Sequence, residues 1–167
     1  MKIKIYCIGK IKEPYLKSGI SEYLTRLQPY CNLEIIEVAD EPIKDNPNSS
    51  DIEKAIDKEG LKVLKLIKPN DYLISLDLGK KQYSSEDFAQ FLMKKIELSG
   101  SNLSFVIGGS YGLSKDLKAR ANDSVTLSQM TFTHQMTRLI LLEQIYRAFK
   151  IINNEVYHKW FIQNSVI

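Results

Sequence analysis

The sequence has few of the side chains that most often build metal sites and nucleophilic active sites. Its 167 residues include only two histidines and two cysteines. The cysteines, Cys7 and Cys31, lack the spacing of a metal-binding pair, and Cys7 lies in an apolar run typical of a small buried side chain. No metal-ligand cluster and no nucleophile-elbow motif is present. Metal hydrolases and triad hydrolases are therefore poor fits, and we expect no bound metal.

Long hydrophobic runs are also missing. No uninterrupted apolar stretch approaches the roughly 20 residues that a membrane-spanning helix needs. The first residues, from Met1 to Ile5, alternate charged and apolar side chains and contain no hydrophobic segment of a secretory leader. We therefore expect a reduced, cytoplasmic, soluble protein without a membrane partner.

No strong excess of one charge is present. The formal net charge is +3 and the pI is about 8.7, which permits a nucleic-acid partner without requiring one. Hydrophobic residues make up 44% of the chain and charged residues 26%, a balance that excludes wholesale disorder. The length suits one domain with its own core.

Strand and helix patterns alternate along the chain. Apolar stretches predict strands over residues 2–8, 33–38, 72–78, 103–107 and 125–127. Amphipathic stretches predict helices from Pro14, after the capping-box pattern Ser50–Glu53, from Ser84 or Ser85 to Gly100, from about Ser114, and from His134 to Ile152. Residues 40–50 predict a polar surface loop. This alternation indicates an α/β fold with a mostly parallel sheet and helices on both faces.

The last predicted helix is apolar over more than one stripe. A helix of this composition is expected to be buried on two sides. We expect a second subunit to provide the second side.

A glycine turn follows the strand that ends at Ile107. The turn, residues 108–112, lacks the lysine of a phosphate-binding loop and the full G-x-G-x-x-G order, so alone it also fits a plain strand–helix turn. Residues 127–134 form a second loop at a strand end, and Leu76 ends a third strand. Main-chain groups at three such ends suit an adenine-bearing ligand, because a purine edge alternates donors and acceptors. A flavodoxin-like nucleotide module is a poorer fit, because its glycine turn follows the first strand.

Polar residues on the last helix have open roles. Thr133 is a candidate N-cap, and the positive end of the helix should keep His134 neutral; a structural role and a ligand contact are equally open for it. Arg138, on an otherwise apolar helix, predicts a carboxylate or an anionic ligand as its partner. Arg147 could form an ion pair with Glu143 or clamp a phosphate.

The segment after this helix contains Tyr157-His158-Lys159. A frayed terminus is one interpretation. The other is that Tyr157 and His158 stack on a base, donate hydrogen bonds and move a proton.

Together these segments resemble one known family. The matching stretches are Val106-Ile107-Gly108-Gly109-Ser110-x-Gly112-Leu113, Ser128-x-Met130-Thr131-Phe132-x-His134-Gln135-Met136-x-Arg138, Glu143-Gln144-x-Tyr146-Arg147-Ala148-Phe149 and Tyr157-His158-Lys159. They resemble the ribosomal large-subunit pseudouridine methyltransferase H family, of the SPOUT class. The resemblance implies a single domain over residues 1–159 with a C-terminal trefoil knot.

The resemblance also implies an activity. It indicates methylation of N3 of a pseudouridine in 23S rRNA, on the assembled 70S ribosome, by a homodimer that uses S-adenosylmethionine. The implied cofactor-binding residues are Leu76, Gly108, Leu127, Ser128, Gln129, Met130, Thr131 and Phe132. The implied catalytic residues are Arg147, Tyr157 and His158, with Lys159 at the substrate. We add Arg138 as a second substrate-binding arginine.

The chain departs from the family pattern in two places. Thr133 replaces a proline that is common before the histidine, and residues 160–167 form an extension beyond the usual end. The alternative function is a non-catalytic, ribosome-associated RNA-binding factor on the same fold. Binding of the methyl donor would separate the two.

Overall fold

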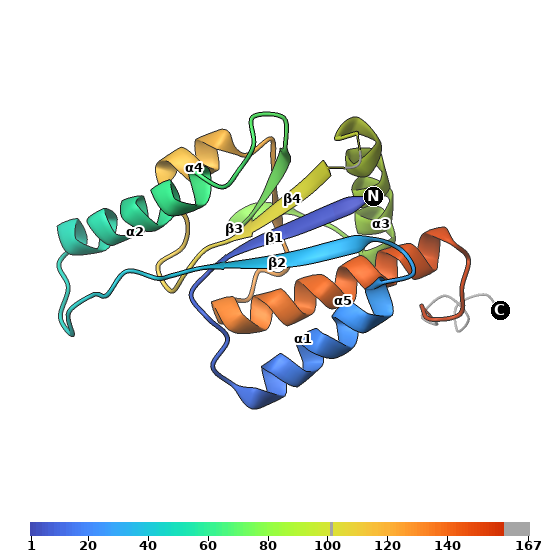
Figure 1. Ribbon diagram of the computed structural model, residues 1–167, viewed down its shortest axis with the longest axis horizontal. Coiled ribbons are helices and arrows are strands. Elements are labelled where there is room, and N and C mark those ends of the chain that lie inside the picture. The colour runs from blue at the N-terminus through green and yellow to red at the C-terminus, as the bar shows by residue number, and fades with distance from the viewer. Residues whose placement is uncertain (101, 159–167) are drawn as a thin grey trace.

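The computed structural model describes residues 1–100 and 102–158 (Figure 1). The described strands are β1 (Lys2–Ile8), β2 (Asn32–Val38), β3 (Tyr72–Gln82), β4 (Asn102–Ile107) and β5 (Asp123–Thr126). They form one sheet in the order β2-β1-β4-β3-β5, and each neighbouring pair is parallel. The described helices are α1 (Pro14–Leu27), α2 (Ser49–Leu64), α3 (Ser85–Leu98), α4 (Lys115–Arg120) and α5 (His134–Ile152).

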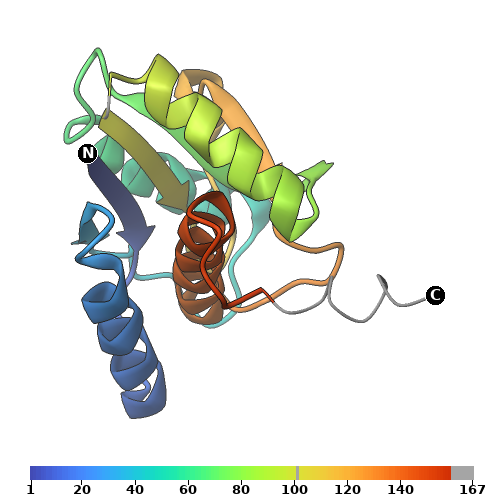
Figure 2. The ribbon, with the colours of Figure 1, turned by 90° about the vertical axis from the view of Figure 1, so that its right-hand side faces the viewer.

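Helices cover both faces of the sheet. Ile3, Ile5 and Cys7 of β1 pack in one apolar cluster with α1, α3 and α5, which Figure 2 shows grouped together. Tyr6 and Ile8 point to the opposite face of the sheet and pack in a second cluster with α2 and α4. The predicted α/β fold is confirmed. The C-terminal knot, the domain limits and the second subunit expected to pack on α5 stay predictions.

Several element boundaries differ from the sequence-based ones. Helix α2 begins earlier, because the side chain of Asn48 accepts from the Asp51 N–H and the Asp51 carboxylate accepts from the Asn48 N–H. The capping box predicted at Ser50–Glu53 was therefore wrong. Strand β3 runs on to Gln82 because, after a bulge between Leu76 and Lys81, it pairs with β5 again. The start of α5 at His134, with Thr133 as its N-cap, is confirmed.

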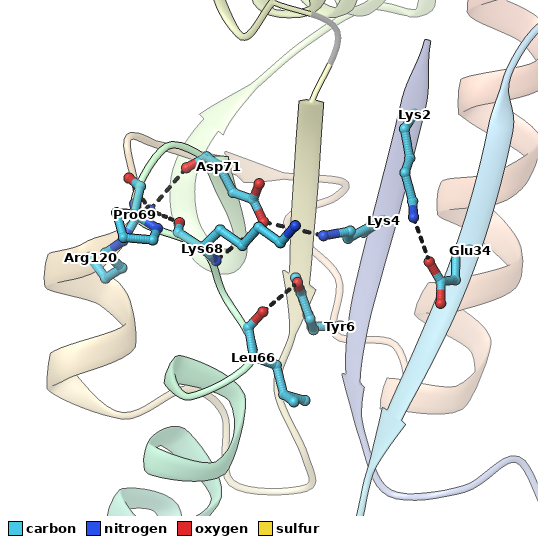
Figure 3. Close-up of polar contacts among 9 residues, drawn as sticks. All are labelled: Lys2, Lys4, Tyr6, Glu34, Leu66, Lys68, Pro69, Asp71 and Arg120. Atoms are coloured by element: carbon cyan, nitrogen blue, oxygen red, sulfur yellow. Dashed lines mark hydrogen bonds and ion pairs between the residues drawn. The ribbon is translucent and has the colours of Figure 1, made fainter.

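A polar network closes the amino-terminal edge of the sheet (Figure 3). The Asp71 carboxylate, just before β3, lies 3.4 Å from Lys4 Nζ of β1. The Nη2 of Arg120 donates to the carbonyl oxygens of Lys68, Pro69 and Asp71 at 3.1, 3.2 and 2.9 Å. These bonds join the α2–β3 turn to β1 and α4.

Candidate functional site

A cleft of about 740 Å³ opens at the carboxyl ends of β4 and β5, beside the bulge of β3. Of the predicted cofactor residues, the ones that line it are Leu76, Gly108, Leu127, Ser128, Met130, Thr131 and Phe132. Gln129 is exposed and does not line the cleft. The three strand ends thus meet in one hollow, where ligands of α/β folds bind.

The glycine turn after β4 is too tight for side chains. A Cβ on Gly108 would lie 2.5 Å from the carbonyl carbon of Gly112, and Gly112 itself has a φ of +90°. The Gly112 N–H donates to the carbonyl of Gly109 at 3.1 Å, which closes the turn. Backbone therefore forms this wall of the cleft, and a ligand can approach its amide and carbonyl groups closely.

The loop between β5 and α5 forms the opposite wall. Its own side chains fix its shape: Ser128 Oγ accepts from the Met130 N–H at 3.0 Å, and Thr133 Oγ1 accepts from the Met136 N–H at 3.2 Å. Thr133, where the family pattern often has proline, thus caps α5. Met130 is 74% exposed and Phe132 39% exposed, so the loop presents apolar surface to the cleft.

Arg138 does not lie where a substrate could contact it. Its side chain is fully buried, and Nη2 donates to the carbonyl oxygens of Ile8 and Gly9, both at 2.8 Å. Nη1 forms an ion pair with Glu37 Oε1 at 2.9 Å. The predicted partner carboxylate is therefore present, while the predicted substrate contact stays a prediction that this geometry does not support. Burial explains the difference, since a guanidinium so deep needs internal acceptors.

The Arg138 contacts belong to a clamp on the segment between β1 and α1. Glu37 Oε1 also accepts from the Ile11 N–H at 3.0 Å, and Gln135 Oε1 accepts from the Lys12 N–H at 2.8 Å. These bonds hold the segment against the start of α5. As a result, Glu13 and Tyr15 line the cleft.

His134 lines the cleft at the start of α5. Burial lowers the pKa of its imidazole, and the nearby charge of Arg138 lowers it further. The prediction of a neutral histidine is confirmed in direction. Burial, rather than the helix end invoked from the sequence, is the main cause.

The charge lining the cleft has one sign. Among the described residues that line it, Glu13 and Asp77 are charged and no lysine or arginine is present. Asp77 also pairs with Lys118 at 2.9 Å. Sequence reasoning missed both carboxylates, although Asp77 directly follows the predicted Leu76 and Glu13 directly precedes the helix start at Pro14. Such a lining favours a positively charged ligand over a polyphosphate.

The three predicted catalytic residues gather elsewhere, near the far end of α5. Arg147 pairs with Glu143 Oε1 at 2.5 Å, and its Nη1 lies 3.1 Å from His158 Nδ1. Arginine can only donate, so Nδ1 accepts and the ring proton lies on Nε2. That nitrogen donates to Glu86 Oε1 at 2.6 Å.

Tyr157 completes this cluster. Its hydroxyl lies 3.2 Å from Glu143 Oε1 and 3.3 Å from the hydroxyl of Tyr23, and the Arg147 guanidinium lies 4.8 Å from its ring centroid. Burial raises the pKa of Tyr157, and the contact with Tyr23 raises it further. The phenol is therefore a hydrogen-bond donor rather than a base. Lys159 lies outside the described residues.

The cleft and this cluster are far apart in one chain. His134 and Arg147 lie near opposite ends of α5. At about 1.5 Å of rise per residue they are separated by about 20 Å along the helix. No side chain spans that distance.

Neither a metal cluster nor a membrane-spanning helix is found in the part of the chain that the structure describes. Residues 1–100 and 102–158 contain no group of three or more potential metal ligands. No helix within the same residues is both long and apolar enough to cross a membrane.

Comparison with known proteins identifies the class. The model of a family described as "Predicted SPOUT methyltransferase" matches residues 1–158. The chain belongs to this SPOUT methyltransferase family.

A curated relative matches the chain over nearly its whole length. Ribosomal RNA large subunit methyltransferase H of Carboxydothermus hydrogenoformans is 52% identical over 159 residues, which make up 95% of this chain and 100% of the relative. The resemblance drawn from the motifs is thereby confirmed.

Two solved structures are more distant. A putative methyltransferase from Legionella pneumophila in complex with the bound cofactor SAM has a TM-score of 0.49 and 10% identity, over 89% of this chain and 66% of that one. TrmJ from Z. mobilis ZM4 has a TM-score of 0.46 and 14% identity, over 88% and 68% of the two chains.

Proposed function

We propose that this protein methylates large-subunit ribosomal RNA with S-adenosylmethionine, at N3 of a pseudouridine in 23S rRNA. The observation that supports this most is the cleft at three strand ends, which is lined by seven of the eight residues that the family resemblance gives for the donor. The closely related sequence is named for rRNA methylation.

The cleft fits this methyl donor. Backbone groups around Gly108 and residues 127–132 would hold the adenosine part, and Glu13 and Asp77 favour the net positive charge of the donor. A nucleotide bearing phosphates lacks a cationic partner in this lining. When bound, the donor supplies a methyl group already activated by its sulfonium charge, so the protein mainly has to align donor and acceptor.

The Arg147 cluster supplies groups suited to the acceptor base. N3 of a pseudouridine has to lose a proton, and His158 Nδ1 has a lone pair to receive it once Arg147 turns toward the substrate. In that position the guanidinium stabilises negative charge that develops on the uracil ring. Tyr157, kept neutral by its raised pKa, stacks or donates a hydrogen bond.

We propose that the active protein is a homodimer. Thr137, the cleft residue of α5 nearest to Arg147 in sequence, lies about 15 Å from it along the helix, and a second copy that brings its Arg147 cluster to the cleft would close this gap. Exposed apolar side chains around the cleft, including Tyr15 and Met130, give such a copy a surface to contact. The substrate is the assembled 70S ribosome in the cytoplasm, since a net charge of only +3 gives weak affinity for bare RNA.

Methyl transfer to purified ribosomes, with the product mapped by mass spectrometry, tests the function. We expect one methyl group on a 23S pseudouridine, little transfer to naked rRNA fragments, and a loss of at least tenfold in rate for His158→Ala. His158→Ala should still bind the donor in a calorimetric titration. Donor binding without transfer to any RNA would instead contradict the proposal.

The non-catalytic RNA-binding alternative predicts another result. Such a factor would bind ribosomes and leave S-adenosylmethionine unbound. Membership of a methyltransferase family and a formed donor cleft argue against it.

A further inference from the structure

Two lysine-bearing segments flank the mouth of the donor cleft. In the sheet order, β1 and β3 are the neighbours of β4 on its two sides, as Figure 1 shows. The segment after β1 contains Lys10 and Lys12, Lys80 lies in the bulge of β3, and Lys81 is the residue at which β3 pairs with β5 again. With strands about 4.8 Å apart, the two segments start on either side of the glycine turn, about 10 Å from each other.

Each segment is fixed to the cleft wall by its backbone. The Lys12 N–H donates to Gln135 Oε1 at 2.8 Å, and the Lys80 N–H donates to Thr126 Oγ1 at 2.7 Å. Thr126 Oγ1 in turn donates to the carbonyl of Asp77 at 2.6 Å. Gln135, Thr126 and Asp77 all line the cleft. The backbones of Lys12 and Lys80 are therefore held beside the cleft, and their side chains take no part in these contacts.

The four side chains are available to a partner. Lys10, Lys12, Lys80 and Lys81 are exposed, and none pairs with a carboxylate of a described residue, whereas Lys62 pairs with Glu41 and Lys118 with the cleft residue Asp77. Lys81 Nζ lies 4.6 Å from the ring centroid of Tyr83, a cation–π contact that leaves the ammonium without a carboxylate partner among the described residues. The charged side chains that line the cleft are Glu13 and Asp77, of which Asp77 is paired with Lys118, and none of the four lysines is among the lining residues.

We propose that Lys10 and Lys12 on one side, and Lys80 and Lys81 on the other, bind backbone phosphates of the RNA strand on the two sides of the target nucleotide. The proposal rests on the proposed function and adds the surface that positions the substrate. An acidic interior accepts the cationic donor while a basic rim accepts the polyanion, so the two substrates do not compete for the same charges. Phosphate contacts of this kind set register and affinity without reading sequence.

Paired alanine variants test the rim. Lys80→Ala/Lys81→Ala and Lys10→Ala/Lys12→Ala leave the backbone N–H donors of Lys12 and Lys80 in place. We expect each pair to raise the KM for ribosomes about tenfold at physiological salt, with kcat and the Kd for S-adenosylmethionine unchanged within twofold. In a plot of the logarithm of the ribosome binding constant against the logarithm of the salt concentration, the slope is negative. Its magnitude should decrease by about 1 for each lysine removed. The matched control is Lys54→Ala/Lys65→Ala, two exposed lysines of the α2 region that also lack a carboxylate partner among the described residues.

The outcomes separate this proposal from the proposed function. Rim pairs that behave like the Lys54/Lys65 control would overturn it, and so would a parallel loss of donor binding. Co-sedimentation with ribosomes measures the same lysine dependence without catalysis, so a wild-type protein that transfers no methyl group leaves this test intact. A photo-crosslinker placed at position 81 should react with rRNA, and reaction with ribosomal protein alone would contradict the proposal.

Discussion

The two edges of the sheet are built on opposite principles. At the amino edge, charged groups are paired: Asp71 with Lys4, and Asp123 with Lys95 at 2.6 Å. At the carboxyl edge, a bare glycine turn, exposed apolar side chains and lysines that have no carboxylate partner within the described part of the chain surround a cleft. The carboxyl edge also contains ion pairs, such as Asp77 with Lys118 and Arg138 with Glu37, but it leaves the glycine turn and the rim lysines open to ligands. Substitutions at the two edges should therefore change different measurements.

The largest effect is expected at Gly108. In Gly108→Ala the new Cβ meets the Gly112 backbone at 2.5 Å, so the turn has to open. We expect the Kd for S-adenosylmethionine to rise at least 100-fold in calorimetry. The control is Gly100→Ala at the amino edge, where φ is +56° but nothing lies within 4 Å. It should cost about 1 kcal/mol of stability and leave donor binding unchanged.

Arg120→Ala should weaken the fold and leave donor binding unchanged, the reverse of what we expect for Gly108→Ala. It removes hydrogen bonds to the carbonyls of Lys68, Pro69 and Asp71 at the amino edge. We expect the free energy of unfolding in urea to fall by about 2 kcal/mol. The Kd for S-adenosylmethionine should stay within twofold of wild type. A clear rise in this Kd would mean that the two edges are coupled.

Gln135 offers a finer test at the carboxyl edge. Gln135→Ala removes the acceptor for the Lys12 N–H and should raise the donor Kd about fivefold with little change in melting temperature. Gln135→Glu keeps an acceptor oxygen and should restore most of the affinity. If Gln135→Glu binds as poorly as Gln135→Ala, the side-chain amide contacts the ligand directly and the clamp explanation is wrong.

The smallest effect expected is a pH dependence from His134. Its folded-state pKa is below the unfolded value of about 6.5, so its contribution to stability is present above that pH and is lost as pH falls toward the folded pKa. Protonation would also add positive charge to a cleft meant for a cation. We expect wild-type stability and donor affinity to decline between pH 7 and 5, and His134→Gln to flatten both profiles. Equal slopes in the two proteins would exclude this role.

Much of the fold could be predicted because its signals are local. Alternate residues of β1, namely Ile3, Ile5 and Cys7, face the same side of the sheet, and this alternation is visible in a short segment. The N-cap at Thr133 is equally local. The cap of α2 was misplaced because two candidate boxes overlap there, at Asn48 and at Ser50, and only backbone geometry separates them. The end of β3 was misplaced because re-pairing after a bulge depends on β5, some forty residues away.

For the site, too, the local features could be predicted from the sequence and the long-range contacts could not. The strand-end residues could be found because parallel strands place their carboxyl ends together. The clamp of Arg138 on Gly9 joins distant segments, so the sequence alone could not separate an internal carboxylate partner from a ligand. The separation of His134 from Arg147, by contrast, follows from the helix that the sequence predicts over His134–Ile152.

The two buried thiols provide intrinsic reporters of how this protein opens. Burial raises the pKa of Cys7 to about 12 and that of Cys31 to about 11, so at neutral pH neither forms appreciable thiolate while the fold is intact. Cys7 lies in a central strand and Cys31 in the turn between α1 and β2. Alkylation kinetics at Cys7 should follow global unfolding, and those at Cys31 should also register local fraying, without any introduced label.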